Sequence, residues 1–153
     1  MARATESVID RFGVATIAEG LELRRAGITA PVTVYSPAPR DIPGIAENGF
    51  VPVVHSAETL RAACSSRLAI ADVKLDTGTH RMGFQTAGET REAAEALKRA
   101  GVKARSVITH FASPGTEKEQ YARYRFLKDV FDSGYGAVCA AETSASDGTA
   151  DDI

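Results

Sequence analysis

The chain has 153 residues, of which 44% are hydrophobic and 25% charged, and its formal net charge is −2. This length allows one domain with a substantial core, and the composition is ordinary for a soluble globular protein. The sequence contains no basic run and no apolar stretch of membrane-spanning length, so we expect neither a nucleic-acid nor a membrane partner.

Short segments rich in β-branched and apolar residues alternate with segments of helical periodicity along the chain. The expected strands are 12–15, 32–35, 51–54, 68–75, 102–108 and a sixth that starts within 136–139. The expected helices are 16–25, 41–49, 57–64, 89–100 and one that starts at 116 and runs through 131. Pro52 weakens the third strand, because proline cannot donate a ladder hydrogen bond.

Several of the expected helices carry recognisable start and stop signals. Thr16 and Thr116 are each followed three residues later by glutamate, which is the pattern of a capping box. Asp41 and Ser56 are expected to cap the helices that follow them. Gly101 stands where the helix 89–100 should end in a left-handed conformation.

Strands that alternate with helices through short connections are typical of a parallel sheet with helices packed outside it. Both an open doubly wound sheet and part of a closed (β/α) barrel fit this alternation. No glycine-rich phosphate loop follows the first strand, which weighs against the open sheet. A complete barrel needs about 250 residues. A chain of 153 residues therefore predicts an α/β fold of the parallel TIM-barrel type, incomplete, with five or six strands.

Polar residues recur where the expected strands end, namely at Tyr35, His55, Lys74, Asp76 and His110. In a barrel the carboxyl ends of the strands share one face, so these side chains would converge around a single ligand-binding mouth. Taken alone, His55 is better explained as a structural residue at a helix start than as a ligand-binding residue. The sequence shows no Ser-His-Asp spacing and no metal-ligand cluster.

Lys74 is costly within a buried strand unless it is paired. Asp76 or Arg81 could supply the partner, and the alternative is a solvent-facing edge position for Lys74. The guanidinium of Arg81 is well suited to bind a carboxylate or phenolate oxygen through paired hydrogen bonds, although an exposed loop position would also explain it. Thr143 and Ser144 could cradle a phosphate, or they could belong to a flexible tail.

The two cysteines, Cys64 and Cys139, are isolated from each other and from other metal-ligand residue types. Such thiols favour buried apolar groups over a disulfide or a metal site. The first residues of the chain lack the apolar centre of a secretory signal. Both observations favour a reduced, cytoplasmic setting.

The segment 73–84, with the sequence VKLDTGTHRMGF, closely resembles a signature segment of the alanine racemases, which are pyridoxal-phosphate (PLP) enzymes built on a TIM barrel. Further segments resemble the same family in the family's order, namely 12–27, 54–56, 109–112, 142–145 and 151–153. The resemblance covers nearly the whole chain. It implies the TIM-barrel type of fold and the cofactor PLP.

The resemblance also implies roles for individual residues. Arg81 would bind near the substrate carboxylate and the phenolic oxygen of the cofactor. Lys74 would be the lysine that is often carbamylated in this family, with its new negative charge paired with Arg81. His110 would line the cofactor ring, and Ser144 would contact the cofactor phosphate. Thr143 stands where the family pattern has asparagine, so a side-chain amide contact is not expected there.

Two parts of the family pattern have no counterpart in these residues: the segment with the Schiff-base lysine and the C-terminal β-domain with the acid/base tyrosine. We therefore expect one partial (β/α) barrel domain over residues 1–153, without a catalytic residue of its own and inactive alone. The intact enzyme that the resemblance implies is a homodimer that interconverts L- and D-alanine and supplies D-alanine for cell-wall peptidoglycan. The alternatives are a fragment of a broader amino-acid racemase, a non-catalytic PLP-binding barrel protein, and a barrel piece kept for protein–protein contact.

Overall fold

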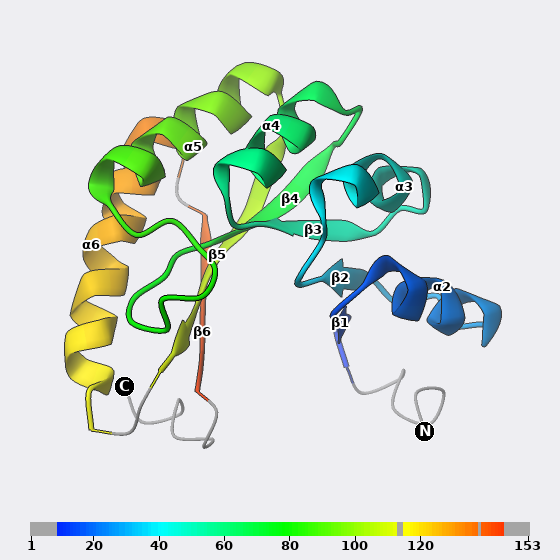
Figure 1. The fold of residues 1–153 in the computed structure, drawn as a ribbon, viewed down its shortest axis with the longest axis horizontal. Coiled ribbons are helices and arrows are strands. Elements are labelled where there is room, and N and C mark those ends of the chain that lie inside the picture. Colours follow the sequence, from blue (N-terminus) through cyan, green and yellow to red (C-terminus); the bar gives the residue numbers. More distant parts are fainter. Residues whose placement is uncertain (1–8, 113–114, 138, 146–153) are drawn as a thin grey trace.

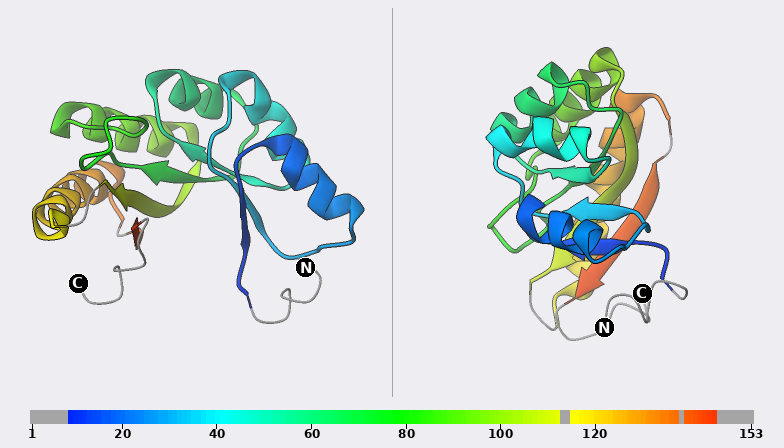
Figure 2. Two further views of the ribbon diagram at one scale, coloured as in Figure 1. Left: turned by 60° about the horizontal axis from the view of Figure 1, so that its bottom comes forward. Right: turned by 90° about the vertical axis from the view of Figure 1, so that its right-hand side faces the viewer.

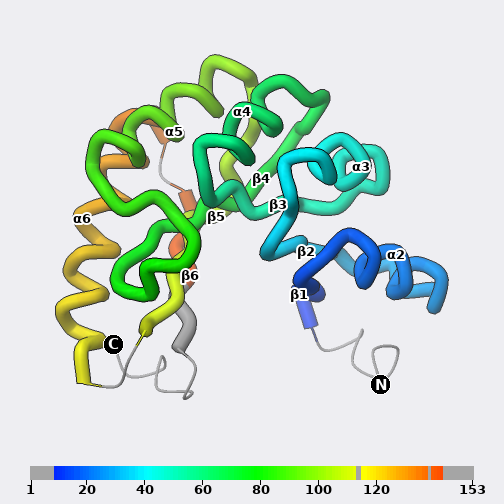
Figure 3. The backbone as a smooth tube through the Cα atoms, in the orientation of Figure 1, coloured from blue at the N-terminus to red at the C-terminus, as the bar shows by residue number. Residues whose placement is uncertain are grey.

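In the computed structural model, six strands pair in parallel and lie side by side in the order of the chain (Figure 1). The strands are β1 (Phe12–Val14), β2 (Val32–Val34), β3 (Val51–Val54), β4 (Ile70–Lys74), β5 (Lys103–Phe111) and β6 (Ala140–Ala145). The structure describes residues 9–112, 115–137 and 139–145. The sheet curls into a half-barrel, which is easily followed in the tube of Figure 3.

Helices connect the successive strands and lie on the convex side of the sheet (Figure 2). They are α2 (Ile17–Arg25), the 3₁₀ turn η1 (Pro39–Asp41), α3 (Ile42–Glu47), α4 (Ala57–Ser65), α5 (Ala87–Ala100) and α6 (Glu117–Tyr135). A doubly wound sheet would reverse its strand order at one point and carry helices on both faces. The consecutive order and the one-sided helices confirm the predicted incomplete barrel of the TIM type.

The apolar core lies between the convex face of the sheet and the helices. Val73 of β4 and Val107 of β5 are fully buried there, together with Leu97 of α5 and Phe131 of α6. Because successive side chains of a strand point to opposite faces, this arrangement leaves the alternate residues for the concave face. That face carries the polar side chains of the candidate site.

Most of the predicted helix signals are confirmed. Thr16 and Glu19 form the expected capping box of α2, and Ser56 caps α4. A capping box that the sequence reading missed, Thr86 with Glu89, starts α5 at Ala87 instead of at residue 89. Gly101 ends α5 in the left-handed conformation, with φ +71°.

Two predicted caps are wrong in detail. Thr116 occupies the N-cap position of α6, but its hydroxyl accepts a hydrogen bond from Gln120 Nε2 at 2.6 Å and none from a helix amide. Its backbone, with φ −117° and ψ 10°, lacks the extended conformation that a capping box uses. Asp41 precedes α3, but its carboxylate accepts from the Ala38 amide at 3.2 Å, because the 3₁₀ turn η1 comes first.

The last two strands differ from their predicted bounds. β5 continues beyond residue 108 to Phe111, where it still pairs with β6. β6 begins at Ala140 and not within 136–139, because α6 extends to Tyr135 and Gly136 ends that helix at φ +82°. The cysteines are free thiols, as predicted. Among the helices of the described residues, none combines the length and the apolar composition that a membrane span requires.

Tyr124 attaches the long helix α6 to the sheet. Its side chain is 2% exposed, and its hydroxyl donates to the Val107 carbonyl of β5 at 2.6 Å. The same oxygen accepts a hydrogen bond from the Glu142 amide of β6 at 3.2 Å. Burial raises the pKa of Tyr124 far above its ordinary value, so the phenol stays protonated at neutral pH. One hydroxyl therefore joins a helix to two neighbouring strands.

We expect Tyr124→Phe to lower the free energy of unfolding by about 1–2 kcal/mol, because it leaves two buried backbone groups without a partner. Urea unfolding followed by circular dichroism measures the change. Tyr121→Phe on the same helix is the matched control, since within the described residues its hydroxyl makes no hydrogen bond and its ring stacks on Tyr124 at 6.4 Å. Equal stability of the two variants would contradict a structural role for the Tyr124 hydroxyl.

Candidate functional site

The loop that follows β4 is folded around the carboxylate of Asp76, which is 2% exposed. This carboxylate accepts five hydrogen bonds, from the amides of Gly78, His80 and Arg81 and from the side chains of Thr79 and Gln85. The loop then returns to the end of β4, where Phe84 forms a bridge with Leu75. The loop thus holds the backbone of Arg81 beside the end of the strand.

A pocket of about 270 Å³ opens at the carboxyl ends of the strands. Lys74 at the end of β4, His110 of β5 and Arg81 of the loop line it. Tyr35, which follows β2, and Glu142 of β6 line it as well. The convergence expected for Tyr35, Lys74 and His110 is therefore observed, and Arg81 joins them.

The other two polar strand-end residues lie elsewhere. His55 lines a separate pocket of about 260 Å³ beside the first turns of α4 and α5. Burial lowers the pKa of His55, and its Nε2 atom has no hydrogen-bond partner within the described residues. The carboxylate of Asp76 instead accepts hydrogen bonds from the amides of the loop that follows β4. His55 thus lies apart from the pocket of Lys74, and Asp76 has a structural part in the loop.

Lys74 is only 7% exposed, so the solvent-facing alternative is wrong. Within the part of the chain that the structure describes, its unmodified amine forms no ion pair, which contradicts the expected pairing with Asp76. The reason is that Asp76 accepts its hydrogen bonds from the loop and Arg81 carries a like charge. Burial lowers the pKa of the Lys74 amine, the charge of Arg81 lowers it further, and Asp76 partly opposes both. The amine is consequently neutral more often than that of an exposed lysine.

His110 lies beside these two cations. Burial lowers the pKa of His110, and the charges of Lys74 and Arg81 lower it further. An imidazole with a lowered pKa is neutral at pH 7. The pocket therefore combines a guanidinium, a buried amine and a neutral imidazole.

The two predicted phosphate ligands lie at the end of β6. The backbone of Thr143 pairs with Thr109, and that of Ser144 pairs with His110. Both positions are thus strand residues and not part of a flexible tail. Their side chains lie outside the described part of the structure, so their contacts with a phosphate stay a prediction.

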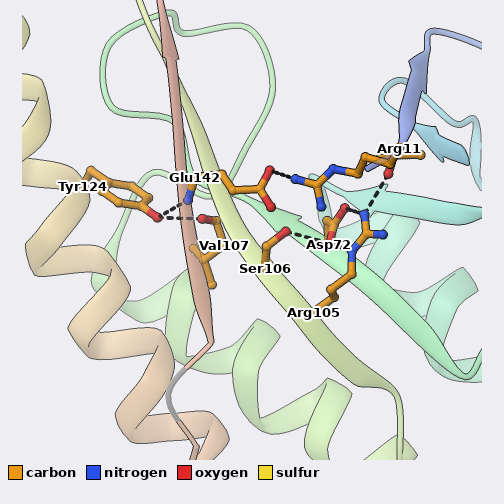
Figure 4. A network of polar contacts seen from close by, with 8 residues as sticks. Arg11, Asp72, Arg105, Ser106, Val107, Tyr124 and Glu142 are labelled. Atoms are coloured by element: carbon orange, nitrogen blue, oxygen red, sulfur yellow. Dashed lines mark hydrogen bonds and ion pairs between the residues drawn. The ribbon is translucent and has the colours of Figure 1, made fainter. Parts of the chain in front are cut away.

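A polar network that the sequence reading missed covers the concave face of the sheet (Figure 4). A β-bulge between β4 and β5 makes two residues of β5, Arg105 and Ser106, face Asp72 of β4. Arg105 Nε and Ser106 Oγ donate to Asp72 Oδ1 at 2.9 and 2.7 Å, and Arg105 also donates to Thr33 Oγ1 of β2 at 2.7 Å. In the sequence, Asp72 and Arg105 each lie within an otherwise apolar strand. Because a buried charge is costly when it is unpaired, their presence there was a signal for this ion pair.

A second ion pair joins the two edges of the half-barrel. Arg11, which directly precedes β1, pairs with Glu142 of β6 across the concave face (Figure 4). Their side chains are 32% and 29% exposed. Glu142 is thereby held at the pocket from both ends, by Arg11 at its carboxylate and by Tyr124 at its amide.

The chemistry of these groups indicates the kind of ligand. A guanidinium and an amine in a partly enclosed pocket favour an anionic group such as a carboxylate, a phenolate or a phosphate ester. Among the described residues, no group of three or more His, Cys, Asp or Glu side chains lies close enough together to hold a metal ion. The cationic groups of the pocket therefore favour an anionic ligand.

Comparison with known proteins agrees with this geometry. The family model described as "Alanine racemase, N-terminal domain" matches residues 1–150. An alanine racemase of Streptococcus pneumoniae (strain Hungary19A-6) is 29% identical over 126 residues, which are 79% of this chain and 34% of that protein. The chain thus spans about a third of the length of the curated relatives that it matches.

Solved structures resemble the half-barrel closely. The alanine racemase of Corynebacterium glutamicum matches with a TM-score of 0.79 and 25% identity, over 88% of this chain and 40% of that one. The alanine racemase of Clostridium difficile 630 matches with a TM-score of 0.78 and 24% identity, over 94% of this chain and 45% of that one. The half-barrel therefore has the architecture of part of these larger proteins.

Proposed function

Because this chain belongs to the family of the alanine racemase N-terminal domain, we propose that it forms the cofactor- and substrate-binding half-barrel of a PLP-dependent racemase that interconverts L- and D-alanine. The observation that carries this proposal is the convergence of Lys74, Arg81 and His110 on one pocket at the carboxyl ends of the strands. In barrel enzymes this end of the strands holds the active site. We further propose that residues 1–153 form a single partial barrel domain.

The donor set of the pocket fits PLP. The cofactor carries a phosphate ester and a phenolic oxygen, and its substrate carries a carboxylate, so the site needs cationic and hydroxyl donors. Arg81 would bind the phenolic oxygen and the substrate carboxylate, and His110 would line the ring. Thr143 and Ser144 would hold the phosphate at the end of β6. PLP, when bound, withdraws electrons from the α-carbon of an amino acid.

Lys74 fits the role of a carbamylated lysine. A carbamate forms when a neutral amine adds to carbon dioxide and releases a proton, and burial beside Arg81 lowers the pKa of the Lys74 amine and so favours the neutral form. The modification would replace the positive charge by a negative one. Lys74 would then attract Arg81 instead of repelling it, which would hold the guanidinium at the pocket.

We expect the chain by itself to bind ligands but not to racemise alanine. Racemisation needs groups that remove and return a proton on opposite faces of the α-carbon. In this family the Schiff-base lysine and the acid/base tyrosine come from segments that these 153 residues do not contain. The intact enzyme would be a cytoplasmic homodimer that supplies D-alanine for peptidoglycan.

Titration of the chain with PLP, followed by absorbance, tests the proposal. We expect Arg81→Ala to weaken binding about 10- to 100-fold, because charge-assisted hydrogen bonds are lost. Arg81→Lys should recover only part of the affinity, since an ammonium cannot bind an oxygen pair as a guanidinium does. Arg99→Ala is the matched control, because Arg99 lies on α5 with 69% of its side chain exposed. Equal affinity of the Arg81 and Arg99 variants, or no PLP binding at all, would overturn the proposal.

A further inference from the structure

We propose that Gln120 is a positioning residue of this pocket, whose buried amide sets the place of the Arg81 guanidinium relative to the His110 imidazole. This inference rests on the proposed function, because it concerns the same pocket. It deepens that function by naming the residue of helix α6 through which two ligand-binding side chains are kept in one geometry.

Gln120 fixes the end of β5 from the helix side. It lies near the start of α6, and its side chain belongs to a residue that is only 6% exposed. Its Oε1 atom accepts a hydrogen bond from the Ala112 amide at 2.9 Å, and its Nε2 atom donates to Thr116 Oγ1 at 2.6 Å. An amide side chain can do both because it carries an acceptor and two donors. Since Ala112 directly follows β5, Gln120 holds the strand end two residues after His110.

The same side chain contacts the loop that carries Arg81. A Cβ added at Gly78 would lie 2.8 Å from Gln120 Oε1 and 3.1 Å from Cδ, so the Gln120 amide rests directly on the backbone of the loop. A side chain at position 78 would occupy the space that this amide fills. The amides of Gly78 and Arg81 both donate to the Asp76 carboxylate. A shift of Gly78 is therefore passed on to Arg81.

A second contact joins the same loop to β5 on the other side of His110. The buried hydroxyls of Thr77 and Thr109 are 2.9 Å apart, and Thr109 also donates to the Leu75 carbonyl at 3.0 Å. The loop thus meets β5 just before His110 through the two threonines and just after it through Gln120. Loss of the Gln120 contact would leave the loop and the strand end joined on one side of His110 alone.

The spacing of Arg81 and His110 matters for ligand binding. The charge of Arg81 lowers the pKa of His110, so the two groups are close enough to interact. This effect has the same sign whether Lys74 is an amine or a carbamate. A ligand that Arg81 binds by an oxygen and His110 contacts by its ring gains from both only while the spacing is kept, because hydrogen bonds weaken steeply when their geometry is lost.

Replacing Gln120 with methionine tests the inference, because it keeps the length of the side chain and removes both hydrogen bonds. We expect Gln120→Met to raise the pKa of His110 toward its ordinary value of 6.5, since Arg81 spends less time beside the imidazole. NMR titration of the full chain without ligand measures this pKa, and His110→Gln assigns the signal. PLP should bind about fivefold more weakly to Gln120→Met. Adding Gln120→Met to Arg81→Ala should weaken binding no further, because Gln120 acts through Arg81.

Tyr135→Phe is the matched control, because it also loosens α6 from β5 but at the opposite end of the strand. The Tyr135 hydroxyl accepts from the Ala104 amide at 3.0 Å and donates to the Val102 carbonyl at 3.1 Å. Thermal unfolding should show a loss for both variants. Only Gln120→Met should change the pKa of His110 and the affinity for PLP. Equal changes of these two quantities in both variants would overturn the inference.

Gly78→Ala perturbs the same contact from the loop side and replaces Gln120→Met if that variant does not fold. It should also raise the pKa of His110, and an unchanged pKa would overturn the inference. So would a loss of PLP affinity in Gln120→Met that is the same with and without the Arg81 side chain.

The outcomes also separate this inference from the proposed function. If PLP binds and depends on Arg81, but Gln120→Met changes neither the affinity nor the pKa of His110, only the role of Gln120 is wrong. If the chain binds no PLP although Gln120→Met raises this pKa, the proposed function is overturned and the positioning by Gln120 is supported.

Discussion

Replacing Asp76 with alanine is expected to lower the free energy of unfolding by about 3–4 kcal/mol, because several hydrogen bonds to a buried carboxylate are lost together. The carboxylate accepts three amides of the loop, those of Gly78, His80 and Arg81, at 3.0–3.1 Å. Without the carboxylate we expect these amides to form hydrogen bonds with water instead, and the loop to open. Because Arg81 belongs to the same loop, the variant should also bind PLP more weakly. Urea unfolding and the PLP titration measure the two effects.

Asp76→Asn is the informative companion, because it keeps the shape of the side chain and removes its charge. Burial opposes ionisation of Asp76, but the hydrogen bonds from Gly78, His80 and Thr79 outweigh it, so the pKa of Asp76 lies below its ordinary value of 3.8. A carboxyl group whose pKa is lowered by folding stabilises the protein fully above its unfolded pKa. That contribution is lost as the pH falls from about 4 toward the folded pKa.

The wild-type chain should therefore lose stability more steeply than Asp76→Asn as the pH falls below about 4. Urea unfolding at a series of acid pH values measures this difference. Parallel pH profiles of the two proteins would show that the charge of Asp76 does not hold the loop.

Replacing Gly83 with alanine is expected to cost about 3–5 kcal/mol, because backbone strain and a steric clash add at this position. Gly83 has a φ of +124°, which side-chain-bearing residues rarely adopt. An added Cβ would lie 2.7 Å from the Asp76 amide nitrogen and 2.8 Å from the Leu75 carbonyl carbon. Both are backbone atoms at the end of β4, so neither can move aside without displacing the strand end. We expect a lower unfolding temperature and weaker PLP binding.

Gly101→Ala is the matched control for this clash. Gly101 also has a left-handed φ, of +71°, but no atom lies within 4 Å of an added Cβ. The change should therefore cost only about 1 kcal/mol, from backbone conformation alone. If the Gly83 variant were no less stable than the Gly101 variant, the close approach of the loop to β4 would be wrong.

Much of the fold could be predicted because its signals are local. The capping box at Thr16 and Glu19 lies within one helical turn, and the alternation of strands with helices needs no knowledge of distant contacts. Local signals failed where neighbouring structure changed the backbone. Thr116 has the residue pattern of a capping box but not its backbone conformation. Gly136, where a strand was expected to start, instead ends α6 in the left-handed conformation.

For the site, the sequence indicated Lys74, Arg81 and His110, because they lie at a strand end, in the following loop and at another strand end. The sequence indicated Glu142 only as the first residue of the segment 142–145 that resembles a site segment of the family, and its position in the pocket lining comes from the structure. The sequence also made Asp76 a possible partner of Lys74. In the structure, however, the Asp76 carboxylate accepts hydrogen bonds from the amides of the loop. A carboxylate surrounded by nearby backbone amides binds them in preference to a side chain, since those amides would otherwise be unpaired.

The sequence by itself thus determined the class of fold, the incomplete barrel and the loop at its centre, because periodicity, caps and a contiguous motif are encoded by neighbouring residues. Only the tertiary structure decided the partners on the concave face. Arg105 meets Thr33, which is 72 residues away in the sequence, and Arg11 meets Glu142 from the opposite edge of the sheet. Such pairs depend on strand register, on a β-bulge and on the curl of the sheet, and these follow from packing of the whole chain and not from any local pattern.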